Sequence, residues 1–379
     1  MRFRDIPGND SVKRALVNMA DSGRVAHAML FYENDGCGAF ALAVAYLQYL
    51  NCPHRADGDS CGVCPTCNKI SKLIHPDVHF VYPVNTGSKS GSLASKDVTS
   101  DTYLKYFREL ACENPYFLES NLSEAIGIEG KVGNISVSEA RNITDALSLT
   151  AVENGYKAVV FLQPEKMNAA TANKLLKIVE EPPEKTIFLF ITHHPDNVMQ
   201  TIFSRCQSSR VLPLDRDEVA EILTERFGVS PEDAAAEAGT CGGSVGVALD
   251  RLRSDEDRQR YLDLFADLID AALGSDLLAA LDAGDAVAAL DSREKQKAFC
   301  TFAADCIRKV FMIQRNLPQI AYLSEQEKDY LTRTAARLPG NFPERMLPLL
   351  DKTVMLLERN VNQKILFCDL ADRVFLNLK

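Results

Sequence analysis

Four cysteines lie close together near the start of the chain, in the spacing C-x8-C-x2-C-x2-C. Cys52, Cys61, Cys64 and Cys67 can converge as thiolates on one tetrahedral ion, and glycines and a proline between them allow the tight turns this needs. Four thiolates complete the coordination shell, so the pattern predicts structural zinc rather than a catalytic metal. The alternatives are a module of reduced thiols that has lost its metal, or one in which His54 replaces a ligand.

A glycine-containing turn follows the first predicted strand, where a nucleotide-binding protein would carry its phosphate loop. Such a loop needs glycines for close backbone approach, a lysine for the β- and γ-phosphates and a hydroxyl for Mg²⁺. Gly36 and Gly38 are present, but Glu33 replaces the first glycine, Ala39 the lysine and Phe40 the Ser/Thr. We expect no productive ATP hydrolysis here and at most weak nucleotide binding. An ordinary strand–turn–helix corner describes the segment better.

A second acidic element is also missing. An ATPase would place an Asp-Glu pair after another strand of the sheet, to hold Mg²⁺ and polarise water. The matching residues here are Leu162 and Gln163, which cannot act as a general base, and Glu165 lies past the strand end. Because two independent elements are lost, the sequence predicts no intrinsic ATPase activity and no ATP as a cofactor.

Short apolar runs alternate with helical patterns over the first two hundred residues. Continuous apolar runs bounded by turn residues are typical of strands in a parallel sheet covered on both faces. They predict an α/β domain with strands at 28–32, 78–82, 158–162 and 186–191.

Residues 85–134 interrupt this pattern and are predicted to form an insertion. Its first part, 85–92, is rich in small polar residues, so we expect a mobile loop that continues into partly helical chain. From Leu214 onward the sequence predicts only helices. The resulting domains are an α/β domain, a small helical domain and a helical bundle, at 1–212, 213–254 and 255–379.

The composition is that of an ordinary globular protein of 379 residues, with 46% hydrophobic and 25% charged residues. A formal net charge of −10 argues against a protein that coats nucleic acid over its whole surface. No apolar run approaches the roughly 20 residues that span a bilayer, and the first residues do not resemble a signal peptide. We therefore expect a cytoplasmic protein without a membrane partner, in which clustered cysteines bind metal rather than form disulfides.

The segment at 173–183, Asn-Lys-Leu-Leu-Lys-Ile-Val-Glu-Glu-Pro-Pro, precedes a predicted strand and then the triplet Ser204-Arg205-Cys206. This order is similar to the signature of bacterial clamp-loader subunits of the AAA+ family. His27 before the first strand and the four-cysteine module also fit. The resemblance covers nearly the whole chain and is weakest in the insertion and the helical tail. It implies an AAA+ domain of the P-loop NTPase type, a helical lid and a collar domain.

Within that family the chain resembles the delta-prime type. The gamma/tau subunits carry intact nucleotide motifs, and they have a nucleotide-sensing arginine where this chain has Gly246. The delta subunits lack the cysteine module and the Ser-Arg-Cys triplet. Two other hypotheses are an active gamma/tau-like ATPase with a degenerate loop and a free-standing zinc-dependent DNA-binding protein.

The resemblance assigns roles to the triplet. Arg205 would act in trans as an arginine finger in the ATP site of a neighbouring gamma/tau subunit, while Ser204 fixes the turn and Cys206 packs inward. An arginine offers a permanent charge and a planar fork of donors, which suit the charge on a transferring phosphoryl group. The alternative is a surface arginine with a carboxylate partner.

The implied partners are the gamma/tau and delta subunits, and through the assembly the beta sliding clamp, primer–template DNA and the DNA polymerase III holoenzyme. The apolar periodicity of the predicted collar fits either an intrachain core or an interface. Four lysines could face DNA phosphates, although such residues more often form a solvated helix face. They are Lys166, Lys174, Lys177 and Lys185.

Overall fold

The computed structural model describes residues 1–87, 89, 98–153, 155–253, 255–290, 292–317, 320–321, 323, 325–359 and 361–378. It divides into two compact units. The first comprises Met1–Ile222 and Gly243–Val247, and the second Leu223–Gly242 and Ala248–Lys379. The sequence predicts three domains, with boundaries after residues 212 and 254. These boundaries are not tested by the division into two units and stay predictions.

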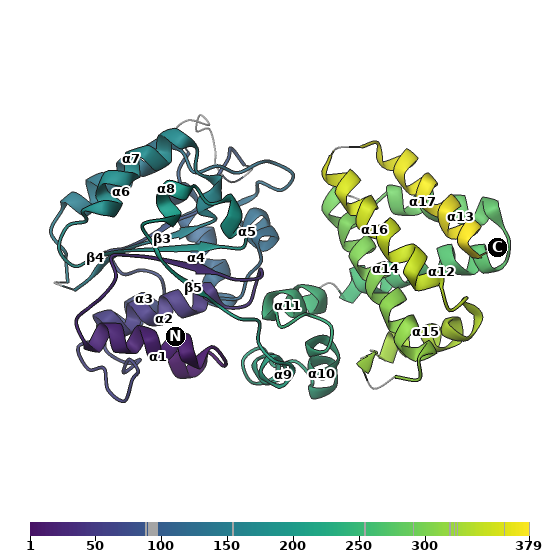
Figure 1. Cartoon of the computed structure of the whole chain (residues 1–379), viewed down its shortest axis with the longest axis horizontal. Coiled ribbons are helices and arrows are strands. Elements are labelled where there is room, and N and C mark those ends of the chain that lie inside the picture. The colour runs from purple at the N-terminus through teal and green to yellow at the C-terminus, as the bar shows by residue number, and fades with distance from the viewer. Residues whose placement is uncertain are drawn as a thin grey trace. The chain divides into compact units, whose positions relative to one another are not determined.

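A five-stranded parallel sheet lies at the centre of the first unit, in the order β2-β3-β4-β1-β5 (Figure 1). The four strands predicted from apolar runs are confirmed. The fifth was missed because its residues, Gln-Ser-Ser-Arg, carry no apolar signal and it forms an exposed edge beside β1. The bounds are β1 Ala28–Tyr32, β2 Val78–Val81, β3 Lys157–Leu162, β4 Thr186–Thr192 and β5 Gln207–Arg210.

Helices cover both faces of this sheet, with α1, α2 and α3 on one side and α6 and α7 on the other (Figure 1). The helix α2 (Ala39–Asn51) is buried from Ala39 to Leu50, as its nearly unbroken apolar sequence predicts. The other helices of this unit are α1 Asp10–Asp21, α3 Pro65–Ser71, α4 Leu104–Glu113, α5 Glu119–Ile126, α6 Val137–Ser148, α7 Ala169–Glu180 and α8 Gln200–Phe203. Short 3₁₀ turns occur at Phe3–Asp5, Ser100–Tyr103, Pro164–Lys166 and Pro195–Asn197.

The described part of the insertion belongs to the first unit and is tied to its neighbours through Ser100, in the 3₁₀ turn before α4. Ser100 donates two hydrogen bonds to the buried Glu139, from its backbone N–H at 2.9 Å and its hydroxyl at 2.5 Å. The Tyr82 hydroxyl donates to the Ser100 carbonyl at 2.7 Å. Of the loop predicted to be mobile, 85–92, residues 88 and 90–92 lie outside the described residues.

The second unit is helical, and its described residues contain no strand, as the sequence predicts. Ser230 begins α10 as expected, because its hydroxyl accepts the Asp233 N–H and Pro231 takes the first helical position. The helices beyond residue 213 are α9 Arg216–Glu225 (which runs from the first unit into this one), α10 Pro231–Ala238, α11 Val245–Arg253, α12 Asp255–Leu273, α13 Leu277–Ala288, α14 Arg293–Gln314, α15 Glu325–Arg337, α16 Phe342–Glu358 and α17 Gln363–Leu378.

A buried ion network joins several helices of the second unit. The Lys309 ammonium contacts Glu327 at 2.6 Å and Asp305 at 2.9 Å. Arg258 contacts Glu327 at 2.9 Å and also pairs with Glu237 of α10. Each buried charge therefore has a partner of opposite sign, which such burial requires. Among the described residues no helix is long and apolar enough to cross a membrane.

Candidate functional site

The turn between β1 and α2 is the segment in which the sequence predicts a degenerate phosphate loop. Gly36 and Gly38 take positive φ angles of 79° and 108°, a conformation that glycine adopts without strain. The turn delivers the chain to the N-terminus of α2, which in nucleotide-binding proteins receives a phosphate. Ala39 and Phe40 begin this helix and are both buried.

The side chain of Glu33 binds the N-terminus of α2. Its carboxylate accepts a hydrogen bond from the backbone N–H of Ala39 at 2.7 Å. An anion from the same chain therefore occupies the position where the helix N-terminus would bind a phosphate. Burial raises the pKa of Glu33, although His193 and the Ala39 amide act in the opposite direction.

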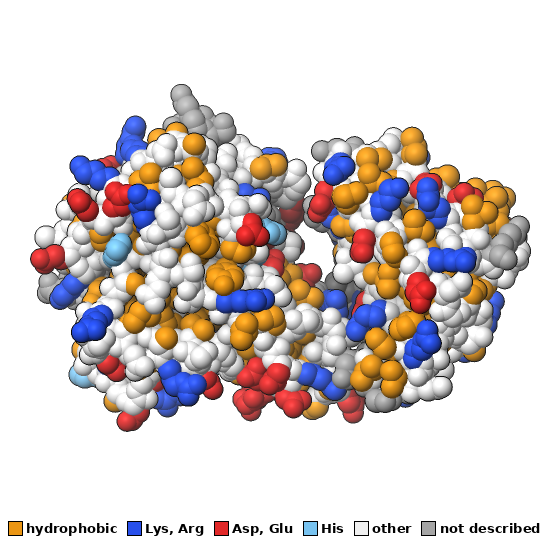
Figure 2. All heavy atoms as spheres, viewed as in Figure 1, with side chains coloured by type: hydrophobic (Ala, Val, Ile, Leu, Met, Phe, Trp, Pro, Cys, Tyr) orange, Lys and Arg blue, Asp and Glu red, His pale blue; other side chains and the backbone are white. Residues whose placement is uncertain are grey.

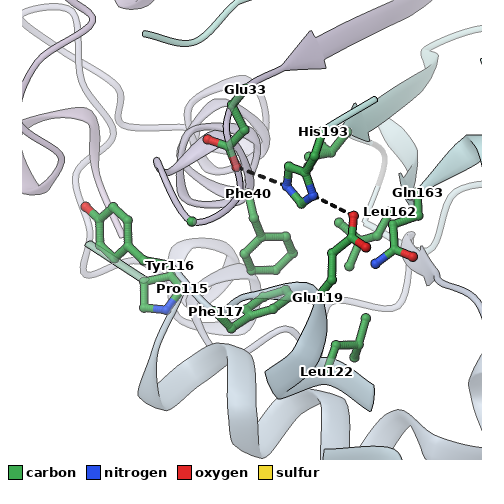
Figure 3. Close-up of a pocket in the computed structure, with 12 residues that line it drawn as sticks. Glu33, Phe40, Pro115, Tyr116, Phe117, Glu119, Leu122, Leu162, Gln163 and His193 are labelled. Atoms are coloured by element: carbon green, nitrogen blue, oxygen red, sulfur yellow. Dashed lines mark hydrogen bonds and ion pairs between the residues drawn. The ribbon is translucent and has the colours of Figure 1, made fainter. Parts of the chain in front are cut away.

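His193 contacts three carboxylates around this turn, those of Glu33, Asp35 and Glu119. Figure 3 shows His193 between Glu33 and Glu119. Its Nδ1 contacts Glu119 at 2.7 Å, and its Nε2 lies 3.6 Å from Glu33 and 3.5 Å from Asp35. Burial alone would lower the pKa of His193, but bonds to Glu119 and Glu33 and the charge of Asp35 raise it to about 10. We therefore describe His193 as an imidazolium at neutral pH.

The positive charge of His193 favours the ionised forms of the neighbouring carboxyl groups and so acts to lower their pKa values. Burial raises the pKa of Asp35 to about 6 against the charge of His193. Burial would also raise the pKa of Glu119, but its hydrogen bond to His193 holds that pKa below its ordinary value. Glu119 further donates its backbone N–H to Asp35 at 3.1 Å. The resulting cluster, defined as Glu33, Asp35, Glu119 and His193, is called the pocket cluster below.

The insertion fills the rest of the pocket. Phe117 lies against Phe40, with ring centroids 5.2 Å apart, and Phe107 and Phe80 approach Phe40 at 5.8 Å and 6.2 Å. Phe40 thus makes an aromatic core where the loop of an ATPase would offer a hydroxyl to Mg²⁺. Insertion residues line the pocket opposite the turn, as Figure 3 shows: Pro115, Tyr116, Phe117, Glu119 and Leu122.

Gly246 lies directly against the turn and within the same unit. Its N–H donates to the Gly36 carbonyl at 3.2 Å, and the Ser244 hydroxyl donates to the Asp35 carbonyl at 2.7 Å. A Cβ atom at Gly246 would lie 2.2 Å from the Tyr116 carbonyl oxygen and 3.0 Å from Gly36 Cα. Any larger residue, an arginine included, would need this backbone to move.

At the end of β3, where an ATPase would carry an Asp-Glu pair, this chain has Leu162 and Gln163. Leu162 is buried, and Gln163 adopts a left-handed conformation with φ 52° at the end of β3. Glu165 turns back and accepts a hydrogen bond from the Thr192 hydroxyl at 2.8 Å. His27 precedes β1, where its carbonyl accepts the Phe188 N–H.

The sequence alone did not identify Asp35, Glu119 and His193 as residues of this site. His193 follows the carboxyl end of β4, which pairs with β1, and ligands of parallel sheets bind at such ends. Because the sequence predicted this strand, the position of His193 directly after it could have identified the histidine as a candidate site residue. Nothing local marks Glu119, because the insertion brings it to the site from between β2 and β3.

The four predicted metal ligands are brought together in one place. The sulfur atoms of Cys52, Cys61, Cys64 and Cys67 all lie within 4.8 Å of one another. Backbone N–H groups of Cys61, Cys64 and Cys67 point at cysteine sulfurs at 3.3–3.4 Å. Hydrogen bonds from the Val63 and Cys64 amides lower the pKa of Cys61. Four converging sulfurs with amide donors suit a tetrahedral metal such as zinc.

The remaining cysteines divide by burial. Cys37, Cys241, Cys300 and Cys306 are buried and pack as small core residues. Cys112 and Cys368 are exposed. Each lies on the solvent side of an amphipathic helix.

Arg205 follows α8 at the surface. Its guanidinium group pairs with Glu180, donates to the Thr201 carbonyl at 2.7 Å and reaches the Ser204 hydroxyl at 3.4 Å. Ser204 closes the helix through its N–H, which donates to Gln200. Cys206 is half-buried beside the core under α7, and burial raises its pKa to about 12. The roles predicted for Ser204, Arg205 and Cys206 in a neighbouring ATP site stay predictions.

The four lysines considered for DNA contact are all exposed and lie on or near α7. On the face drawn in Figure 2, Lys and Arg side chains are interspersed with Asp and Glu rather than gathered in one patch. This mixture fits a solvated surface, and DNA contact stays a prediction.

Comparison with known proteins identifies the family. A family model described as "DNA polymerase III, delta subunit" matches residues 8–215. The chain belongs to this family. The predicted resemblance to clamp-loader subunits of the delta-prime type is thereby confirmed, and so is the predicted fold class, an AAA+ α/β domain followed by helices.

Members of the DNA polymerase III delta family and related subunits match at low identity. "DNA polymerase III subunit delta'" of Yersinia pestis is 30% identical over 193 residues, 51% of this chain and 44% of the relative. The protein of that name from Bacillus subtilis is 25% identical over 65% of this chain and 59% of the relative. A gamma/tau subunit of Mycobacterium bovis is 27% identical over 61% of this chain and 33% of the relative. The chain thus spans about half the length of the first two relatives.

Proposed function

We propose that this chain is a non-hydrolysing subunit of a bacterial clamp loader that completes the ATP site of a neighbouring gamma/tau subunit with Arg205. The observation that carries the proposal is the Glu33 carboxylate on the Ala39 amide, at the place where a nucleotide phosphate would bind. The chain supplies its own anion there, so its remaining contribution to ATP chemistry must be made at another subunit's site.

Charge around the turn also opposes nucleotide binding. A triphosphate would approach the three carboxylates of the pocket cluster, and the single cation among them, His193, already contacts all three. Like charges at such distances repel strongly where burial lowers the effective dielectric constant. The turn offers neither the lysine nor the hydroxyl that could offset this repulsion.

Arg205 has the chemistry and the exposure for a role in trans. Its side chain is 34% exposed at the end of α8, so a neighbouring subunit can reach it. A guanidinium group placed against the transferring phosphoryl stabilises the charge that develops there. Because the ATP site is complete only across an interface, hydrolysis would depend on correct assembly.

The other elements of the proposal are supported by the cysteine cluster and by the family to which the chain belongs. Zinc bound by the four cysteines would stabilise the module between α2 and α3 without taking part in chemistry. The helices of the second unit would form the collar for assembly with gamma/tau and delta. Through that assembly, in the cytoplasm, the chain would help to place the beta sliding clamp on primed DNA for DNA polymerase III.

The test is ATP hydrolysis by a loader reconstituted with the gamma/tau and delta subunits of the same organism, in the presence of clamp and primed DNA. Arg205→Ala is compared with Arg210→Ala, which removes an exposed arginine from the adjacent edge strand. Size-exclusion chromatography must show equal assembly. Loss of turnover with Arg205→Ala alone supports the proposal, and equal turnover in all three loaders refutes the arginine-finger role.

The match to gamma/tau subunits supports a second candidate, an active ATPase with an unusual loop. Equilibrium binding of labelled ATP to the isolated chain separates the two. The proposal predicts no saturable binding at millimolar nucleotide, whereas micromolar affinity would favour the ATPase.

A further inference from the structure

The guanidinium group of Arg205 is already engaged in the isolated chain. Its Nε and Nη2 both bind one carboxylate oxygen of Glu180, and its Nη1 donates to the Thr201 carbonyl at 2.7 Å. The Ser204 hydroxyl lies 3.4 Å from the same Nη1. All three nitrogens of the fork therefore have partners within this chain, and these are the nitrogens that a phosphate would need.

Glu180 occupies a position that its own helix does not favour. It is the last residue of α7, where the carbonyl groups point outward and the helix dipole disfavours a negative charge. Its side chain is 44% exposed, so burial does not account for it either. The partner that stabilises this carboxylate is Arg205, which α8 brings to the end of α7.

We infer that Glu180 is a latch, which holds Arg205 on its own subunit until the nucleotide of a neighbouring subunit displaces the carboxylate. The inference rests on the proposed arginine-finger function and adds how that arginine is regulated. A triphosphate carries more negative charge than one carboxylate and offers several acceptor oxygens to the same fork. Exchange from Glu180 to phosphate therefore becomes favourable only when an occupied site is docked in place.

The exposure of the pair makes the exchange feasible. Ion pairs at the surface are weak, because water screens them and two long side chains lose freedom in forming them. Such a latch can open without unfolding its surroundings. It would keep Arg205 ordered and neutralised between encounters.

The first experiment uses the isolated full-length chain. Phenylglyoxal adds to accessible guanidinium groups, and peptide mass spectrometry follows its addition at Arg205. We expect Glu180→Gln to react about two- to fivefold faster than wild type, the factor that an exposed ion pair supports. Glu184→Gln, which removes a carboxylate from the turn that follows α7, should react like wild type. Equal rates for wild type and Glu180→Gln would overturn the latch.

The second experiment uses the reconstituted loader and measures ATP hydrolysis before clamp and DNA are added. Glu180→Gln should raise this basal rate about two- to fivefold, and the increase should disappear in a double variant that also carries Arg205→Ala. A free energy of unfolding for Glu180→Gln within about 1 kcal/mol of wild type would show that the variant keeps its fold. A basal rate that falls, or an increase that survives Arg205→Ala, would overturn the latch.

The two experiments separate failure of the latch from failure of the arginine finger. If Arg205→Ala leaves stimulated turnover unchanged, the proposed function fails, whatever the reactivity of Arg205 in the isolated chain. If Arg205→Ala abolishes turnover while Glu180→Gln changes neither reactivity nor basal rate, the arginine acts without a latch.

Discussion

In the first unit, the pocket cluster and the Arg205–Glu180 pair both bring acids to a cation, but the two differ in burial. In the pocket cluster the Glu33 side chain is 4% exposed and His193 15%, while Asp35 and Glu119 at its edge are 34% and 29% exposed. At the surface, Arg205 is 34% exposed and Glu180 44%. Buried charges are costly to separate, because each would be left without water or partner, whereas exposed charges are readily solvated.

The difference assigns the two clusters opposite behaviour. Under the proposed function, the pocket cluster would hold the turn, α2 and the insertion together in place of a nucleotide. The Arg205–Glu180 pair would leave a cation available for exchange with a ligand from a neighbouring subunit. The same kind of contact would then close one site and keep the other open.

The largest effect on stability should come from removing the buried cation. His193→Gln leaves three carboxylates without their cation, and loss of one partner from a buried pair costs about 3–5 kcal/mol. Protonation of Asp35, whose pKa is already raised, should reduce this cost. Urea unfolding followed by circular dichroism measures it, with His194→Gln as the exposed control. Equal midpoints for the two variants would refute a stabilising pocket cluster.

The protonation of His193 should make the free energy of unfolding depend on pH. The folded chain holds the His193 proton up to a pKa of about 10, and the unfolded chain loses it near the ordinary 6.5. The contribution of His193 to the free energy of unfolding is therefore complete below pH 6.5 and lost as the pH rises towards 10. The difference between wild type and His193→Gln should shrink across that window. A difference that grows with pH would contradict the assignment.

A steric change should weaken the closed pocket less. Gly246→Ala places a methyl group 2.2 Å from the Tyr116 carbonyl oxygen, so backbone must shift. Overpacking of this kind costs about 1–3 kcal/mol. Gly340→Ala is the matched control, because a Cβ there has no heavy atom within 4 Å. Hydrogen–deuterium exchange of α2 peptides should accelerate in Gly246→Ala alone. Unchanged exchange would show that the backbone at Gly246 and Tyr116 can shift without destabilising α2.

The smallest effect belongs to the surface pair. A double-mutant cycle of Arg205→Ala and Glu180→Gln should give a coupling energy of about 0.2–1 kcal/mol in urea unfolding, as for other exposed pairs. The same cycle in 1 M salt should approach zero, because screening acts on exposed charges. A coupling of several kcal/mol would make Arg205 structural and remove the contrast with the pocket cluster.

The sequence by itself determined the features that depend on local pattern. Cysteine spacing predicted the convergence of Cys52, Cys61, Cys64 and Cys67, and continuous apolar runs predicted four of the five strands. The absence of a lysine at Ala39 and of an acid at Leu162 follows from the order of residues alone, because these motifs are contiguous in the chain. Family membership followed from similar short signatures.

Only the tertiary structure decided which charges meet. The pocket cluster draws on three segments, around residues 33, 119 and 193, which the sheet and the insertion bring together. Glu180 and Arg205 also become neighbours only because α7 and α8 pack side by side, and β5 forms only because β1 offers it an edge. Pairing and burial depend on contacts between distant residues, and burial decides whether a pair of charges is permanent or exchangeable.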